Sequence, residues 1–302
     1  MADMKWDPDE RVRLAAFEFL SEQTRLRGEV LHRRVLQQGF SFEGTRVPLM
    51  SPQGIFKPAI LPEIPLSMTT VPLIEGKEPP YEDVVRPDGM ISYRYRGSDP
   101  SHRDNVGLRL AMTRRTPLVH FQGIVPGEYM PTWPVYIVDD SPQSLTFTVA
   151  ADAPSVLGQV PRIADPMAEA GRRAYVTRQV QQRMHQHSFR IRVLRAYQER
   201  CAICRLKHRE LLDAAHIVPD AHPQGVPSVR NGLALCNLHH AAFDRNLLGI
   251  RPDFVVELRK ELLDEEDGPM LVHGLQGVQG TRILLPRAVD KHPDAARLEL
   301  RF

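Results

Sequence analysis

The spacing of apolar residues predicts a helical beginning to the chain. Asp7 followed by Pro8 is typical of a helix start, because aspartate caps free first-turn amides and proline suits the first helical position. Apolar residues then recur at roughly helical spacing as far as Gly39: Val12, Leu14, Phe17, Leu20, Leu26, Val30, Leu31 and Val35. The pattern predicts one long helix, or two with a break. We expect it to pack on the domain that follows, with a coiled-coil or dimer contact as the alternative.

From Phe40 to about Ala150 the pattern changes to short runs of β-forming residues among frequent prolines and glycines. Turn signals such as Pro87-Asp88-Gly89 separate the runs. The predicted strands lie within 90–95, 117–125, 135–138 and 145–149, with a short helix at 105–112. This segment is therefore expected to form a mainly β domain, either a barrel or a strongly bent sheet.

The second half of the chain begins with a predicted linker. Residues 151–168 contain three prolines among residues of mixed polarity. A helix is expected from Ala168 to about Arg200, followed by β runs at 254–258 and 281–285. The predicted organisation is a domain at 1–150, a linker at 151–168 and a second domain at 169–302.

Composition narrows the class of protein. The chain has 302 residues, of which 42% are hydrophobic and 25% charged, as in a soluble globular protein of two domains. No apolar run approaches the roughly 18–20 residues that span a bilayer, so no membrane partner is expected. The first residues show no signal-peptide pattern, and the three cysteines are clustered. These features favour a cytoplasmic protein.

Charge is distributed unevenly although the net charge is only +2. Residues 172–209 are rich in arginine and contain Glu199 as their acidic residue. A solvated helix face would explain such a stripe, but its position before a metal-type hairpin favours a surface that follows DNA phosphates. Arg190 in this stripe and Arg245 beyond it are the expected phosphate contacts.

The cysteines are spaced as metal ligands. Cys201 and Cys204 form a C-x-x-C pair, and Cys236 and His239 form a C-x-x-H pair. Two such pairs a few tens of residues apart are typical of a tetrahedral structural Zn²⁺ site.

Four further polar residues lie within or beside this hairpin. A helix is expected to begin at His240. Asp244 lies four residues further along it, so both side chains can bind one divalent cation, Mg²⁺ or a similar metal. His216 ends the first predicted strand, and a neutral imidazole there can accept a proton from water. Asn231 begins the return strand, where its side chain either orients His216 or holds the loop.

The order of His216, Asn231 and His240 within two metal knuckles resembles the HNH, or ββα-metal, nuclease family. The resemblance covers roughly residues 190–251. It implies that His216 is the general base, His240 a ligand of the catalytic metal and Asn231 a structural or orienting residue. Asp244 takes a helix position that is often histidine in the family. Ala215 departs from the pattern, because many members have a metal-binding aspartate immediately before the base.

A segment of the first domain resembles the SRA family of modified-cytosine readers. Tyr81-Glu82-Asp83 and Tyr95-Arg96-Gly97 match the motifs that build the family's pocket, although the spacing is longer and a glycine-rich start is missing. The resemblance implies a PUA-type barrel with a pocket for a flipped base. Its predicted residues are Tyr81, Asp83, Tyr93 and Tyr95, and ordinary core tyrosines with a salt-bridged aspartate are the alternative.

The predicted fold class is therefore α+β, with an SRA-like β barrel preceded by a helix and a zinc-stapled HNH domain. The expected function is a modification-dependent endonuclease acting on double-stranded DNA that carries 5-methyl- or 5-hydroxymethylcytosine. Because one HNH site cuts one strand at a time, a homodimer is a plausible assembly. The alternatives are a non-catalytic zinc-hairpin protein that binds DNA, and an HNH nuclease indifferent to modification.

Overall fold

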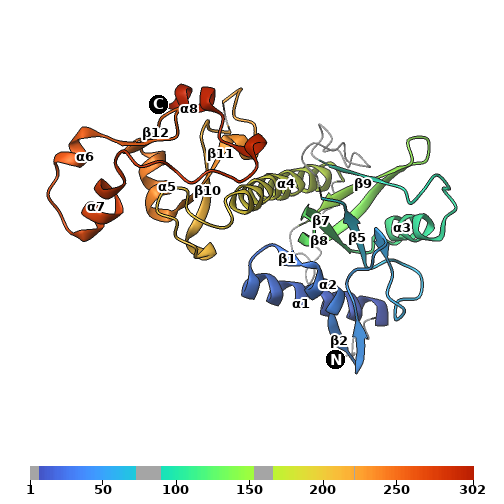
Figure 1. Cartoon of the computed structure of the whole chain (residues 1–302). Helices are drawn as coiled ribbons and strands as arrows, with labels where there is room; N and C mark the ends of the chain where they lie inside the picture. Colours follow the sequence, from blue (N-terminus) through green and yellow to red (C-terminus); the bar gives the residue numbers. More distant parts are fainter. Residues whose placement is uncertain (1–6, 73–89, 153–165, 221) are drawn as a thin grey trace. The chain divides into compact units, whose positions relative to one another are not determined.

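The computed structural model describes residues 7–72, 90–152, 166–220 and 222–302. The chain divides into two compact units, Met1–Met184 and His185–Phe302 (Figure 1). The boundary falls inside a helix, α4 (Pro166–Ala196), and not at the ends of the predicted linker. Residues 153–165 of that linker lie outside the described part of the chain. Within that part, no helix is both long and apolar enough to cross a membrane.

The N-terminal unit begins with two helices separated by a break, as one of the two sequence alternatives predicts. Helix α1 (Pro8–Arg27) has Asp7 as its N-cap and proline in its first turn, and it ends at Gly28. Strand β1 (Leu31–His32) and helix α2 (Arg33–Gln38) follow. The chain turns at Gly39, which has a φ of 58°, and a Cβ there would lie 1.9 Å from the Val47 carbonyl oxygen. Glycine is therefore required at this position.

Helix α1 packs on the rest of its unit and buries one face there. Val12, Ala16, Phe17 and Leu20 belong to a hydrophobic cluster that also includes residues of the sheet. Arg13 is fully buried, and its guanidinium donates to the carbonyl oxygens of Ile64, Pro65 and Pro117. The helix thus has the packing role that the sequence favours over a dimer contact.

A curled sheet forms the body of the N-terminal unit. Its strands run in the order β4-β5-β7-β8-β9-β6, with β1 paired to β8. The pairs are antiparallel except for β5 with β7, which are parallel. The strands are β4 (Ile55–Phe56), β5 (Ser67–Thr70), β6 (Ile91–Arg94), β7 (Leu118–Val125), β8 (Glu128–Ser141) and β9 (Thr146–Ala151).

The four predicted β runs and the short helix of this unit are confirmed. They correspond to β6, β7, β8 and β9, and to helix α3 (Arg103–Arg114). The sequence pattern missed β4, β5 and the hairpin of β2 (Phe40–Phe42) with β3 (Thr45–Val47). These strands have only two to four residues each, too few for an alternating pattern to stand out.

The C-terminal unit contains the last part of α4 and the predicted hairpin. Strands β10 (Leu212–His216) and β11 (Gly232–Cys236) are antiparallel, and helix α5 (Asn237–Asp244) follows directly. A second hairpin pairs β12 (Leu248–Ile250) with β13 (Val256–Leu258). Three short helices complete the unit: α6 (Lys260–Asp264), α7 (Pro269–Gly274) and α8 (Ala295–Arg301).

Two predictions for this unit need correction. The run 281–285 contributes an isolated antiparallel bridge between Arg282 and Val255 instead of a full strand, because its backbone hydrogen bonds to residues 254–256 end at Ile283. Helix α5 begins at Asn237, before both histidines, and not at His240. His239 and His240 are therefore consecutive helical residues that point in different directions.

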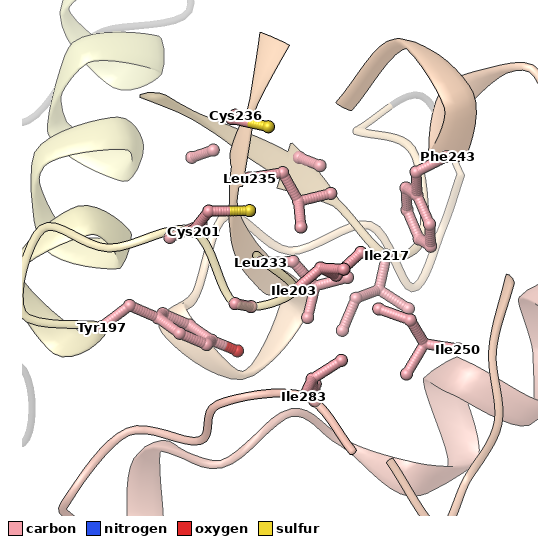
Figure 2. Close-up of a cluster of buried hydrophobic side chains, with 14 of the residues drawn as sticks. Tyr197, Cys201, Ile203, Ile217, Leu233, Leu235, Cys236, Phe243, Ile250 and Ile283 are labelled. Atoms are coloured by element: carbon pink, nitrogen blue, oxygen red, sulfur yellow. The ribbon is translucent and has the colours of Figure 1, made fainter. Parts of the chain in front are cut away.

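A single hydrophobic core holds the two hairpins together. Leu233, Leu235 and Ile217 pack with Phe243 of α5 and Ile250 of β12 (Figure 2). Cys201 and Cys236 lie at the border of the same cluster, so the predicted metal ligands adjoin the core (Figure 2). The core thereby sets the position of the strand and the helix that carry the candidate catalytic residues.

Candidate functional site

The predicted zinc ligands converge in the structure. The ligand atoms of Cys201, Cys204, Cys236 and His239 all lie within 4.8 Å of one another. Nδ1 of His239 is 3.1 Å from the Cys236 sulfur, and the Cys204 and Cys236 sulfurs are 3.8 Å apart. A tetrahedral zinc with sulfur ligands at about 2.3 Å separates two sulfurs by roughly 3.8 Å. The donor set and its dimensions therefore fit a zinc ion.

Contacts around the four ligands prepare them for a metal. Nε2 of His239 lies 2.9 Å from the carbonyl oxygen of Gly274, and this contact assigns the Nε2 proton and leaves Nδ1 as the ligand. Hydrogen bonds from Cys204 and Cys236 lower the pKa of Cys201, which favours the thiolate that zinc binds. Gly274 belongs to α7, so an element beyond the predicted motif supports the site.

His216 is the last residue of β10 and lies against helix α4. Its ring stacks on Phe189, with centroids 3.9 Å apart and planes 12° from parallel. Gly232, the cross-strand partner of His216, makes this stacking possible. A Cβ on Gly232 would come within 2.9 Å of the Phe189 ring and 2.4 Å of Val193. Glycine at this position therefore allows the helix to approach close enough to cover the imidazole.

The environment of His216 suits a neutral base. Burial lowers the pKa of His216, while the carboxylates of Asp220 and Asp244 act in the opposite direction. Nε2 of His216 is buried and has no hydrogen-bond partner in the described part of the structure. Unpartnered buried polar atoms are uncommon in folded proteins and occur preferentially at functional sites. The imidazole is thus predominantly uncharged at neutral pH and available to accept a proton.

Asn231 holds the loop that follows His216. Its side chain is fully buried, accepts a hydrogen bond from the Val218 amide at 2.9 Å, and donates to the carbonyl oxygens of Val218 and Val226. The sequence left two roles open for this residue. The contacts correspond to the loop-holding role, because the amide makes its hydrogen bonds with backbone groups and none with the imidazole.

His240 and Asp244 face each other across one turn of α5. Nε2 of His240 lies 3.2 Å from an Asp244 carboxylate oxygen. The Asp244 side chain is 55% exposed, so a hydrated cation and a phosphate group can reach it. The two side chains that the helical spacing predicted as cation ligands are therefore adjacent.

Asp213 also belongs to this group, although the sequence analysis missed it. One of its carboxylate oxygens is 3.8 Å from Nδ1 of His240, on the opposite side of the ring from Asp244. Strand side chains alternate, so Asp213 shares a face with Ala215, the position where the HNH pattern often has an aspartate. This i, i+2 relation was visible in the sequence and could have identified the residue.

The predicted phosphate contacts Arg190 and Arg245 differ in their surroundings. Arg190 donates to the other carboxylate oxygen of Asp213 at 3.1 Å and to the carbonyl oxygens of Arg209 and Leu212. Its donors are thus directed at strand β10 and the turn before it, and its position suits holding Asp213 better than contacting DNA. Arg245 is exposed, and it donates only weakly, at 3.3 Å, to a helix carbonyl oxygen. Its position is compatible with a phosphate contact.

Of the four predicted base-pocket residues, the two that the structure describes, Tyr93 and Tyr95, do not lie on an open surface. Tyr93 and Tyr95 are 5% and 4% exposed. Tyr95 stacks on Phe147 and donates to the Asp140 carboxylate, while Tyr93 lies edge-on to His120. Both are therefore core tyrosines, the alternative that the sequence left open, because alternate residues of β6 point inward. Tyr81 and Asp83 lie outside the described residues.

Comparison with known proteins identifies the class of the C-terminal unit. Residues 201–251 match the family model described as HNH endonuclease. This segment contains both metal pairs and the residues His216, Asn231, His240 and Asp244. Residues 201–251 therefore form an HNH endonuclease domain, and this match supports a nuclease, which is a hydrolase.

A solved structure with similarity to this chain is the modification-dependent TagI restriction endonuclease. The two sequences are 14% identical, and the match covers 79% of this chain and 81% of that chain with a TM-score of 0.27. A comparison with curated proteins found no match. The family match does not extend into the first unit, so an SRA-like reader of modified cytosine stays a prediction.

Proposed function

We propose that the protein is a DNA endonuclease in which His216 activates water against a phosphodiester bond. The observation that carries this proposal is the neutral, half-buried imidazole of His216 at the end of a strand beside the His240–Asp244 pair. Water attacks phosphorus, its proton passes to His216, and the bond from phosphorus to the leaving oxygen breaks. A 3′ or 5′ phosphate and a hydroxyl end result.

In this proposal His240 and Asp244 hold a divalent cation, Mg²⁺ or a similar metal. When bound, such an ion polarises the phosphate and stabilises the leaving oxygen. Asp213 contributes from the far side of the ring. With Nε2 as the metal ligand, the ring proton would lie on Nδ1, where the Asp213 carboxylate 3.8 Å away would favour it. Asp213 thereby compensates in part for the alanine at position 215.

The zinc site would stabilise the hairpin that carries these groups. Cys201 and Cys204 precede β10, while Cys236 and His239 join β11 to α5. A zinc ion held by all four would tie together the ends of the elements that carry His216 and His240. Structural zinc sites contribute directly to folding free energy.

We further propose that the N-terminal unit selects the DNA target by reading a modified cytosine. Support comes from the Tyr81–Asp83 and Tyr95–Gly97 motifs and from the curled sheet with a leading helix. Because Tyr93 and Tyr95 are buried, the reading residues would have to come from other positions, Tyr81 and Asp83 among them. A dimer would allow two HNH sites to cut both strands.

A single cleavage assay separates these proposals. Plasmids that are unmodified, 5-methylated or 5-hydroxymethylated at cytosine are incubated with the protein and Mg²⁺ or Mn²⁺. We expect cutting of a modified plasmid and little cutting of the unmodified one. Equal cutting of all three would leave an HNH nuclease indifferent to modification. Binding without metal-dependent nicking of any plasmid would indicate the non-catalytic alternative.

A further inference from the structure

Arg301 lies in α8, outside the matched HNH segment, and its guanidinium reaches into that segment. Nη1 donates to the Ile217 carbonyl oxygen at 3.3 Å, and Nη2 donates to the Phe243 carbonyl oxygen at 2.8 Å. Ile217 directly follows His216, and Phe243 directly precedes Asp244. The Arg301 side chain therefore links the backbone beside His216, the proposed base, to the backbone beside Asp244 of the His240–Asp244 pair.

The surroundings of the Arg301 guanidinium favour this one geometry. It lies over the ring of Phe243, 4.2 Å from the centroid, and Nη2 is 3.4 Å from the Asn246 side-chain oxygen. Only arginine provides a planar fork that can stack on a ring and donate to two carbonyl groups at once. A lysine retains the charge but cannot make both bonds in this arrangement.

Helix α8 is fixed to the HNH domain independently of Arg301. Asp294 caps the helix and accepts an ion pair from Arg230 at 3.1 Å. Arg297 donates to the Ser228 hydroxyl, and Leu298 is buried in the core. The two polar contacts are made with the loop between β10 and β11. The backbone of Arg301 is thus anchored by elements other than α5. The Arg301 side chain can therefore act as a spacer between α5 and β10.

We propose that Arg301 is a positioning residue that sets the separation between His216 on β10 and the His240–Asp244 pair on α5. This inference rests on the proposed endonuclease function. Loss of the fork would let the end of α5 move relative to the end of β10. Displacement of reacting groups by about 1 Å is enough to reduce rates by as much as 100-fold. DNA affinity would stay unchanged, since Arg301 is directed at backbone groups of the protein.

The test compares Arg301→Lys and Arg301→Gln with a matched control, Arg251→Lys. Arg251 is exposed, and its side chain pairs with the neighbouring Asp253. Initial rates are measured on the plasmid that the wild type cuts, and are normalised to folded protein by zinc content. We expect a fall in kcat of roughly 10- to 100-fold for both Arg301 variants, with KM for DNA within about twofold of the control.

A second readout does not depend on activity. The imidazole NMR signals of His216 and His240 should shift in the Arg301 variants and stay in place in Arg251→Lys. A kcat for both Arg301 variants equal to that of the control, with unshifted signals, would overturn the positioning role while leaving the nuclease intact. If the wild type cuts no plasmid, the proposed function fails instead, and the NMR comparison still decides whether Arg301 positions the two histidines.

Discussion

The two units each contain a histidine whose pKa is lowered by burial, yet the two side chains have different surroundings. His120 in β7 is 2% exposed, and its Nε2 is 2.8 Å from the Thr70 hydroxyl. His216 at the end of β10 is only half-buried, and its Nε2 has no partner in the described structure. The low pKa alone therefore does not identify a catalytic residue. An unpartnered nitrogen beside carboxylates distinguishes His216 from a satisfied core histidine.

The largest contrast between the units concerns their dependence on zinc. Removal of zinc by a chelator, or Cys201→Ala, should unfold the C-terminal hairpin, since structural zinc contributes about 10–16 kcal/mol in small zinc domains. The N-terminal unit should stay folded, because its core contains none of the metal ligands. Both tryptophans, Trp6 and Trp133, precede residue 184, so tryptophan fluorescence reports on that unit. Hydrogen exchange of β10 and β11 reports on the other.

Chelation could reduce both the stability measured by tryptophan fluorescence and the hydrogen-exchange protection of the hairpin. In that case the two units do not fold independently. A chelator that leaves the hairpin protected would show that its core suffices without metal. Cys204→Ser is a useful milder variant, because Cys204 is the exposed member of the cluster.

Replacement of His216 should abolish cleavage and preserve DNA binding. General bases typically contribute about 10²- to 10⁴-fold to rate, so His216→Ala is expected to cut about 10²- to 10⁴-fold more slowly than the wild type. Binding is followed by gel shift in Ca²⁺, and zinc content confirms folding. A variant that cuts at near wild-type rate would remove His216 from the mechanism. His120→Gln is the matched control, since it alters a buried histidine of the other unit.

His120 should instead affect stability in a pH-dependent manner. Burial lowers the pKa of His120 to about 4, whereas the unfolded chain has an ordinary histidine pKa of 6.5. The unfolded state therefore binds the proton first, and stability is lost as pH falls from 6.5 towards 4, by up to about 3 kcal/mol. Urea unfolding followed by tryptophan fluorescence at pH 7.5 and 4.5 measures this loss. His120→Gln should flatten the pH dependence, and an unchanged slope would assign it to other groups.

Asp213→Asn should reduce activity by roughly 10- to 100-fold, in the range found for residues that orient metal ligands. The amide retains the size of the side chain but removes the charge near Nδ1 of His240 and weakens the bond from Arg190. The apparent affinity of this variant for Mn²⁺ should also fall, as measured from the nicking rate at increasing Mn²⁺ concentration. Asp253→Asn is the control, because Asp253 is an exposed aspartate that is likewise paired with an arginine, Arg251. Equal effects of the two variants would indicate a general loss of negative charge.

The smallest expected effect concerns the ring that covers His216. Phe189→Leu removes the stacking and part of the burial that lowers the pKa of His216. The pKa should rise towards its ordinary value, so the acid limb of the cleavage profile should move to higher pH. In the wild type that limb lies below pH 6.5. A profile unchanged in Phe189→Leu would show that solvent, not the ring, controls the titration.

The local features of this protein were readable from the sequence. The capped first helix, the four β runs and the metal pairs depend on neighbouring residues and regular spacing, which a pattern preserves. The candidate site was predicted for the same reason, since Cys201 to Asp244 form one continuous hairpin and helix. Short strands such as β4 and β5 were not predicted, because their conformation depends on pairing with neighbouring strands and not on a pattern in their own sequence.

Only the tertiary structure decided which side chains share an environment. It buried Tyr93 and Tyr95, directed Arg190 at Asp213 and left the Asn231 amide on backbone groups of its own loop. It also brought Gly274 and Arg301, far along the chain, to the candidate zinc ligands and the candidate catalytic residues. Packing between distant elements depends on the shape of the whole core, and a local sequence pattern does not determine that shape.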